Sequence, residues 1–214
     1  MGTQTPPAGT ASTRARLLDA AAKLFHEQGI HVGVDAVCRA AGVSKRSMYQ
    51  LFAGKEDLVA ASLERVAPEY SAALLPAADD GGSPRERIRH VFERLEELEP
   101  AQDFLGCPFV ATAVQARSPE HPASLVARRQ KDGLTAFFRH EARRGGARDP
   151  ELLARQLTMV FDGASVRSVM QARELDGLAV TTANALMEVA GMGPPAASGD
   201  GAVLAGSAPA ETTA

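Results

Sequence analysis

The amino-acid sequence predicts an all-α protein built from amphipathic helices. Hydrophobic residues make up 45% of the 214 residues, and alanine supplies much of that share. Alanine is the strongest helix former, whereas aromatic residues, which favour strands, make up only 5%, with no Trp. Along several segments apolar residues recur at intervals of three to four, which places them on one face of a helix.

The first helix is expected from Thr13 to Gln28 and ends at Gly29. Its apolar residues follow the i, i+4, i+7, i+8 pattern: Leu17, Ala21, Leu24 and Phe25. This face is expected to bury against the two helices that follow.

Residues 34–52, VDAVCRAAGVSKRSMYQLF, predict two short helices joined by a tight turn. Gly42 can end the first helix because glycine adopts the left-handed backbone of a helix C-terminus. Ser44 can cap the second helix with its hydroxyl. In that second helix Met48 and Phe52 share the inner side, together with Leu51.

The outward side of the second helix carries the chemistry of DNA recognition. It presents basic, phenolic and amide side chains: Lys45, Arg46, Tyr49 and Gln50. Four basic residues and no acidic one lie between Arg39 and Lys55, although the whole chain has a net charge of −3. Cations bind phosphates, and Arg or Gln can read base edges in the major groove. A solvated face with no partner is the alternative for such a cluster taken alone.

Residues from about Thr13 to Leu58 resemble the DNA-binding domain of the tetracycline-repressor (TetR) family. The segments that carry the resemblance are ARLLDAAAKLFHEQG, VDAVCRAAGVSKRSMYQLF and KEDL. The resemblance implies a three-helix module with a helix-turn-helix, fused to a helical dimerisation and ligand-binding domain. It also implies repression of transcription that a small molecule relieves. The expected divisions are a disordered arm (1–12), the DNA-binding domain (13–58), the helical domain (59–190) and a disordered tail (191–214).

The candidate DNA-binding residues are Gly33, Arg39, Ser44, Lys45, Arg46, Ser47, Tyr49, Gln50 and Lys55. Tyr49 and Lys55 match the phosphate-contacting pair of the family. Gly33 stands where Thr or Ser is more frequent and offers no hydroxyl to a phosphate. Arg46 stands where a small residue is usual, and Leu51 where His or another polar residue is frequent. The operator sequence therefore cannot be borrowed from a relative.

The rest of the chain predicts further helices with recognisable starts and breaks. Gly54 caps a helix from Lys55 to about Tyr70, which Pro68 is expected to end or kink. Ser83 caps the next helix, which begins at Pro84. Later helices are expected over 102–117 with a broken start at Gly106–Pro108, over 122–144, from Pro150 onward, and over 177–189.

The helix that begins at Pro150 has two apolar faces. One face contains Leu153, Leu157, Val160, Phe161 and Ala164; the other contains Leu152, Met159, Val166 and Met170. A helix that is apolar on two sides is buried on two sides. Gly163 costs about 1 kcal/mol relative to Ala, which close approach of another helix can offset. The last two helices resemble the dimerisation pair of the family, so a homodimer is expected.

The ligand-binding candidates are apolar or weakly polar residues of the central helices: Phe92, Phe104, Cys107, Phe109, Gln115, Phe138 and Phe161. Ordinary core packing is the alternative for each one singly. Together they suggest a small apolar effector. Cys107 at a helix start can also be an activated thiolate, because helix N-termini lower the pKa of a thiol.

Enzyme motifs and metal or cofactor sites are not evident. The sequence has no GxxxxGK[ST], HExxH or GxSxG motif, and its five histidines lack metal-ligand spacing. Two distant cysteines indicate neither a disulfide framework nor a zinc site, which fits a reducing, cytoplasmic setting. No apolar run is long enough to span a membrane, and the N-terminus lacks the pattern of a secretion signal. A helical protein-interaction module that uses the basic segment around Arg128 is the alternative function.

Overall fold

The computed structural model describes residues 12–98, 105–171 and 174–193. All regular secondary structure in these ranges is helical. The helices are α1 (Thr13–Gln28), α2 (Val34–Ala41), α3 (Lys45–Leu51), α4 (Lys55–Leu74), α5 (Pro84–Leu98), α6 (Pro108–Ala116), α7 (Pro122–Arg144), α8 (Pro150–Gln171) and α9 (Leu178–Val189). The predicted fold class is therefore confirmed. None of these described helices is both long and apolar enough to cross a membrane.

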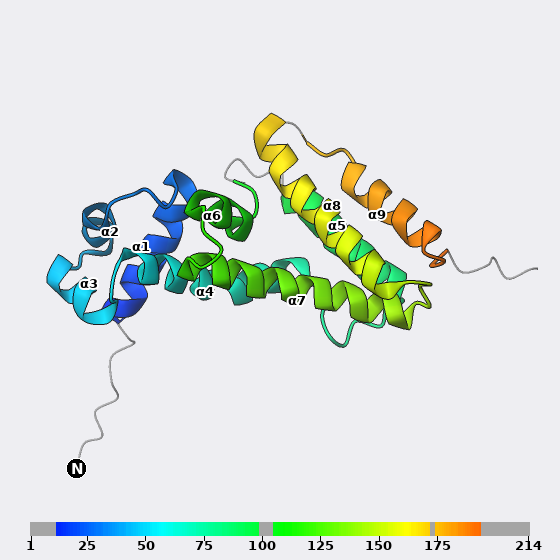
Figure 1. Cartoon of the computed structure of the whole chain (residues 1–214), viewed down its shortest axis with the longest axis horizontal. Coiled ribbons are helices and arrows are strands. Elements are labelled where there is room, and N and C mark those ends of the chain that lie inside the picture. Colours follow the sequence, from blue (N-terminus) through cyan, green and yellow to red (C-terminus); the bar gives the residue numbers. More distant parts are fainter. Residues whose placement is uncertain (1–11, 99–104, 172–173, 194–214) are drawn as a thin grey trace, which may run out of the picture.

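The molecule is elongated, and its two ends have different roles in the fold. Figure 1 shows α1, α2 and α3 gathered at one end and α8 and α9 at the other. Between them α4 and α7 run side by side, and α6 lies against α1 and α7. The two ends are thus connected by α4, of 20 residues, and α7, of 23 residues.

Two hydrophobic cores hold these parts together. The first core joins α1–α3 to the first half of α4, to α6 and to the start of α7 through residues such as Leu58, Phe109 and Val126. The second core contains α5, α8, α9 and the second half of α7. The expected boundary between 58 and 59 falls inside α4, between two buried residues, and stays a prediction. Because α6 shares a core with α1, a displacement of α6 strains its contact with the N-terminal module.

Several predicted helix starts have the expected hydrogen bonds. Ser83 and Glu86 form a capping box, in which Ser83 N donates to Glu86 Oε2 (2.8 Å) and Glu86 N donates to Ser83 Oγ (3.3 Å). Asp149 Oδ1 accepts from Leu152 N (2.9 Å) at the start of α8.

Two sequence-based expectations differ in part from the structure. Of the two effects expected of Pro68, an end or a kink of the helix, the first does not occur, because α4 continues to Leu74. The proline is exposed, and burial of Leu63 before it and Leu74 after it stabilises the continuous helix. Met192, which was expected in a disordered tail, is buried beside Gly145; residues 1–11 and 194–214 lie outside the described residues.

Gly106 brings the segment before α6 into close contact with α8. Its φ is +80°, and an added Cβ would lie 2.8 Å from the Ser165 carbonyl oxygen. We expect Gly106→Ala to lower the free energy of unfolding by about 2 kcal/mol, from backbone strain and this clash. The matched control is Gly133→Ala in α7, where an added Cβ meets nothing within 4 Å. That change should raise stability by roughly 0.5–1 kcal/mol in urea unfolding; equal effects of the two would contradict the packing described.

Candidate nucleic-acid interface

The turn between α2 and α3 has the geometry that the sequence predicts. Gly42 lies in the left-handed region (φ 63°, ψ 39°), and its N–H donates to the Arg39 carbonyl (3.2 Å). Val43 N donates to the Cys38 carbonyl (2.9 Å), which completes the end of α2. Gly33 is the N-cap of α2 and provides no side-chain hydrogen bond.

The second helix of the motif, α3, is anchored by its buried face and capped at its start. Met48 is fully buried in the first core, and Phe52 is buried next to it. Ser44 Oγ accepts from Ser47 N (3.0 Å), and the two hydroxyls are 2.8 Å apart. Ser47 is therefore partly engaged in the cap. Arg14 from α1 lies 5.3 Å from the centre of the Phe52 ring, so α1 also contacts the end of α3.

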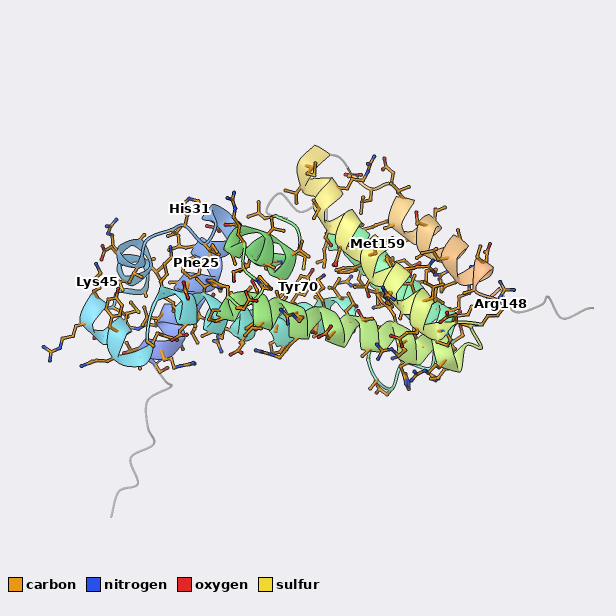
Figure 2. The ribbon with its side chains drawn as sticks, in the orientation of Figure 1. Phe25, His31, Lys45, Tyr70, Arg148 and Met159 are labelled. Atoms are coloured by element: carbon orange, nitrogen blue, oxygen red, sulfur yellow. The ribbon has the colours of Figure 1, made fainter. Side chains whose placement is uncertain are left out.

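Buried Met48 and Phe52 turn the polar side of α3 outward. Tyr49 is 53% exposed, and Lys45, Arg46 and Gln50 are exposed as well. The prediction that this face of α3 is open to solvent is thus confirmed. Leu51 is 40% exposed and was wrongly expected on the inner side. Arg39 on α2 is also exposed, while Lys55 at the start of α4 is half-buried. In Figure 2 Lys45 lies at the end of the molecule opposite Arg148.

Lys45 is held by an acidic neighbour that the sequence analysis did not single out. Its Nζ lies 2.9 Å from Asp35 Oδ1 and donates to Asp35 Oδ2 (3.1 Å). The hydrogen bond to Asp35 and its charge raise the pKa of Lys45, which stays protonated. Arg46, in contrast, forms no ion pair with any residue in the described ranges. Arg46 can therefore contact DNA without breaking an ion pair, whereas Lys45 must first weaken its pair with Asp35.

The second helix of the motif, α3, is anchored by buried residues, follows a turn with a left-handed glycine, and exposes a basic face. These features define a helix-turn-helix DNA-binding protein. Residues 17–62 match the model for bacterial regulatory proteins of the tetR family. The structure is similar to a TetR transcriptional regulator of Streptomyces avermitilis MA-4680 (SAV143), with 54% identity, a TM-score of 0.83, and 85% of this chain and 100% of that chain covered. The chain therefore belongs to the TetR family of transcriptional regulators.

The chain is also similar to two more distant transcriptional regulators, one by structure and one by sequence. SCO4454, a TetR-family transcriptional regulator of Streptomyces coelicolor, is 26% identical, with a TM-score of 0.71 over 84% of this chain and 93% of that chain. The HTH-type transcriptional regulator BetI of Rhizobium meliloti (strain 1021) is 24% identical over 162 residues, which are 74% of this chain and 78% of BetI.

The Lys45–Asp35 pair makes a prediction about DNA affinity. We expect Asp35→Asn to tighten binding to any DNA sequence, because it removes a negative charge beside the phosphates and releases Lys45. The slope of log K against log salt concentration should become steeper by about 0.9, the contribution of one more phosphate contact. Asp19→Asn is the matched control, since Asp19 pairs with Arg65 (3.0 Å) between α1 and α4. An unchanged slope in Asp35→Asn would show that Lys45 gains no phosphate contact when Asp35 is neutralised.

The candidate effector residues that the structure describes are not brought together in one cavity. Phe92 and Phe138 stack at 5.6 Å, Phe161 meets Phe92 edge-on at 6.5 Å, and all three rings are fully buried. These rings fill the second core with one another, so they leave little room for a ligand. Phe161 borders only a small cavity, of about 160 Å³. Phe104 lies outside the described residues.

The other three candidates belong to α6 and its start. Phe109 is fully buried in the first core, and Gln115 Oε1 accepts from Ile30 N (2.9 Å). Cys107 is the N-cap of α6 and is 2% exposed. Burial disfavours reaction of this thiol with a dissolved oxidant. The nearby Tyr70 hydroxyl is buried, and burial raises the pKa of Tyr70, as do the neighbouring Cys107 and Asp162.

A larger cavity, of about 620 Å³, lies elsewhere, between α1, α4 and the start of α6. None of the six predicted ligand residues that the structure describes lines it. Part of its lining comes from small or aliphatic side chains such as Ala22, Val66 and Ala73, which composition and spacing do not mark as a site. The described residues contain no group of three or more His, Cys, Asp or Glu side chains that could hold a metal ion.

The basic segment of α7 is divided among separate ion pairs. Arg129 pairs with Glu64 (2.7 Å), Lys131 with Asp162 (2.5 Å), and Arg139 with Glu151 (2.6 Å). Arg128 donates to the Pro119 carbonyl (2.9 Å). Paired cations spread along a 23-residue helix do not form a free basic surface. This arrangement disfavours the alternative of a protein-interaction module built on the Arg128 segment.

Proposed function

We propose that the protein is a homodimeric repressor that binds a palindromic operator in double-stranded DNA and is released from it by a small molecule. The observation that carries the proposal is the exposed face of α3, where Arg46, Tyr49 and Gln50 lie above the buried Met48. In this role Arg46 and Gln50 read base edges. Tyr49 and Lys55 contact phosphates, and Lys45, which is paired with Asp35, adds a weaker phosphate contact.

A dimer is needed because one short recognition helix contacts few base pairs. Two copies related by a twofold axis would place their α3 helices in successive major grooves, about 34–36 Å apart. The apolar stripe of α8 supports this assembly. It consists of Leu152, Met159, Gly163, Val166 and Met170, at intervals of seven, four, three and four. Met159 and Met170 are 69% and 78% exposed in the single chain. Apart from its chain neighbours and the backbone of its own helix, no atom of the chain lies within 4 Å of a Cβ added at Gly163, so this position is open as well.

The last helix, α9, extends the same surface. Leu178 and Val189 of α9 are exposed apolar residues, and Ala185 between them is also exposed. Figure 1 shows α8 and α9 next to each other at the end of the molecule away from α3. A four-helix interface of α8 and α9 from each copy would bury this surface.

Footprinting on the DNA upstream of its own gene tests the proposal. The purified full chain is expected to protect two half-sites related by a dyad, with protected grooves one helical turn or a multiple of it apart. Protection should weaken as salt concentration rises, because phosphate contacts release counterions. A protein that protects no upstream sequence even at low salt, or that protects a single half-site as a monomer, would contradict the proposal. Loss of protection with a bound small molecule would support the release step.

A further inference from the structure

The cavity between the DNA-binding module and the helical domain has the size of a ligand site. Its volume of about 620 Å³ lies within the roughly 300–1,000 Å³ usual for small-molecule pockets. One wall is the last turns of α1, including Ala22 and Phe25; another is α4, from Val59 to Ala73. The third comes from the residues that lead into α6, up to Thr112. Figure 2 shows Phe25 and Tyr70 on opposite sides of this junction.

The lining is mostly apolar, and its few charged groups have an excess of negative charge. The ionisable side chains are Lys23, His26, Glu27 and Glu69, besides the phenol of Tyr70. Lys23 pairs loosely with Glu27 (3.8 Å), whereas Glu69 forms no ion pair with a described residue. Burial lowers the pKa of His26, so this imidazole is neutral at pH 7. One Lys against two Glu leaves a net charge of −1, which favours a cation over an anion.

Besides the shared core, a hydrogen bond connects the wall formed by α6 to the DNA-binding module. Thr112 lines the cavity, and one turn later Gln115 Oε1 accepts from Ile30 N (2.9 Å). Ile30 lies in the turn that leads from α1 into α2. The contact is tight, because an added Cβ at Gly29 would lie 2.6 Å from Gln115 Oε1. A molecule wedged between α1 and α6 would separate Gln115 from this turn.

We propose that this junction cavity, and not the aromatic core of α5, α7 and α8, is the effector site. It takes a small, mostly apolar molecule that is neutral or bears one positive charge. Its occupancy moves α6 away from α1, breaks the Gln115–Ile30 hydrogen bond, and so shifts α2 and α3 relative to DNA. The ligand site is inferred from the cavity alone. The last step, the shift of α2 and α3 relative to DNA, rests on the proposed function.

The binding test uses three fluorescent probes on the full chain without DNA: neutral N-phenyl-1-naphthylamine, cationic dansylcadaverine and anionic 1-anilinonaphthalene-8-sulfonate. The neutral and cationic probes are expected to bind once per chain and the anionic probe about fivefold more weakly than the cationic one. Glu69→Gln should reduce that charge preference and leave the neutral probe unaffected.

Cavity-filling variants locate the bound probe. Ala73→Trp on α4 and Ala22→Trp on α1 should each weaken binding by about tenfold or more, because the indole occupies the space. Ala72→Trp is the matched control, since Ala72 is exposed and does not line the cavity. Circular dichroism checks that each variant is folded, and the two walls provide independent tests. Unchanged probe affinity in both filled variants would overturn the site.

The coupling test measures affinity for upstream DNA with and without saturating cationic probe. In the unmodified protein the probe is expected to weaken DNA binding by about tenfold, within the usual range of allosteric coupling. Gln115→Ala should bind the probe normally but lose most of this effect, whereas Gln28→Ala, an exposed glutamine near the same turn, should keep it. Full coupling in Gln115→Ala, or none in the unmodified protein, would overturn the route. Probe binding at the cavity by a protein that never binds DNA would support the site and contradict the proposed function.

Discussion

Replacing Met159 with glutamate is expected to convert the protein to a monomer and to weaken operator binding by more than about 100-fold. Met159 is 69% exposed in the single chain and lies in the middle of the apolar stripe of α8. In a twofold dimer the substitution would bury two like charges without partners, which costs several kcal/mol. A monomer presents one α3 helix, so it loses the second half-site and the affinity gained by binding both together.

Sedimentation and operator binding measure the two effects on the same samples. Ala136→Glu is the matched control, because it places the same charge at an exposed position of α7. That variant should remain dimeric and bind the operator as the unmodified protein does. A Met159→Glu protein that stays dimeric would place the interface elsewhere. A monomer that binds the operator with unchanged affinity would contradict the need for two half-sites.

The two-sided character of α8 could be predicted because it depends on helical periodicity alone. Residues such as Leu153 and Leu157 recur on one side and are buried, whereas Leu152 and Met159 recur on the other and are exposed. The α2–α3 turn could be predicted for the same kind of reason. Gly42 and Ser44 act through the backbone of their immediate neighbours, so their roles depend on local sequence.

Interactions between distant segments could not be predicted from these local patterns. The Lys45–Asp35 pair crosses the turn between two helices, and Gln115 reaches Ile30 over 85 positions. No helical spacing relates such partners. Pro68 is a second case. A proline inside a helix removes a backbone hydrogen bond, but burial of Leu63 in the first core and Leu74 in the second stabilises the continuous helix.

The position of the cavity was missed for a different physical reason. Aromatic residues suggest pockets because they line many ligand sites. Phe92 and Phe138, however, stack on each other and fill the core between their helices. The open space lies instead between α1, α4 and the start of α6, where α1 and α4 contribute small side chains, Ala22 and Ala73, to the lining. A cavity is a lack of side-chain volume between elements, and one chain segment cannot indicate what the facing segment fails to fill.

Replacing Arg46 with alanine is expected to change which DNA sequence the protein prefers. Arg46 is exposed in the first turn of α3, has no ion-pair partner among the described residues, and lies one turn before Gln50 on the same face. An Arg that reads a guanine edge contributes about 1–3 kcal/mol of discrimination. Arg46→Ala should therefore weaken operator binding by about 5- to 150-fold while binding to random DNA falls much less.

Lys55→Ala provides the contrast, because a phosphate contact carries no sequence information. It should weaken operator and random DNA by similar factors and reduce the salt slope by about 0.9. Competition of labelled operator with random duplex, at two or more salt concentrations, separates these behaviours. If Arg46→Ala lowered both affinities equally, Arg46 would be a phosphate contact as well. Sequence reading would then fall to Gln50, whose amide can pair with adenine, and Gln50→Ala would be the variant that relaxes the preference.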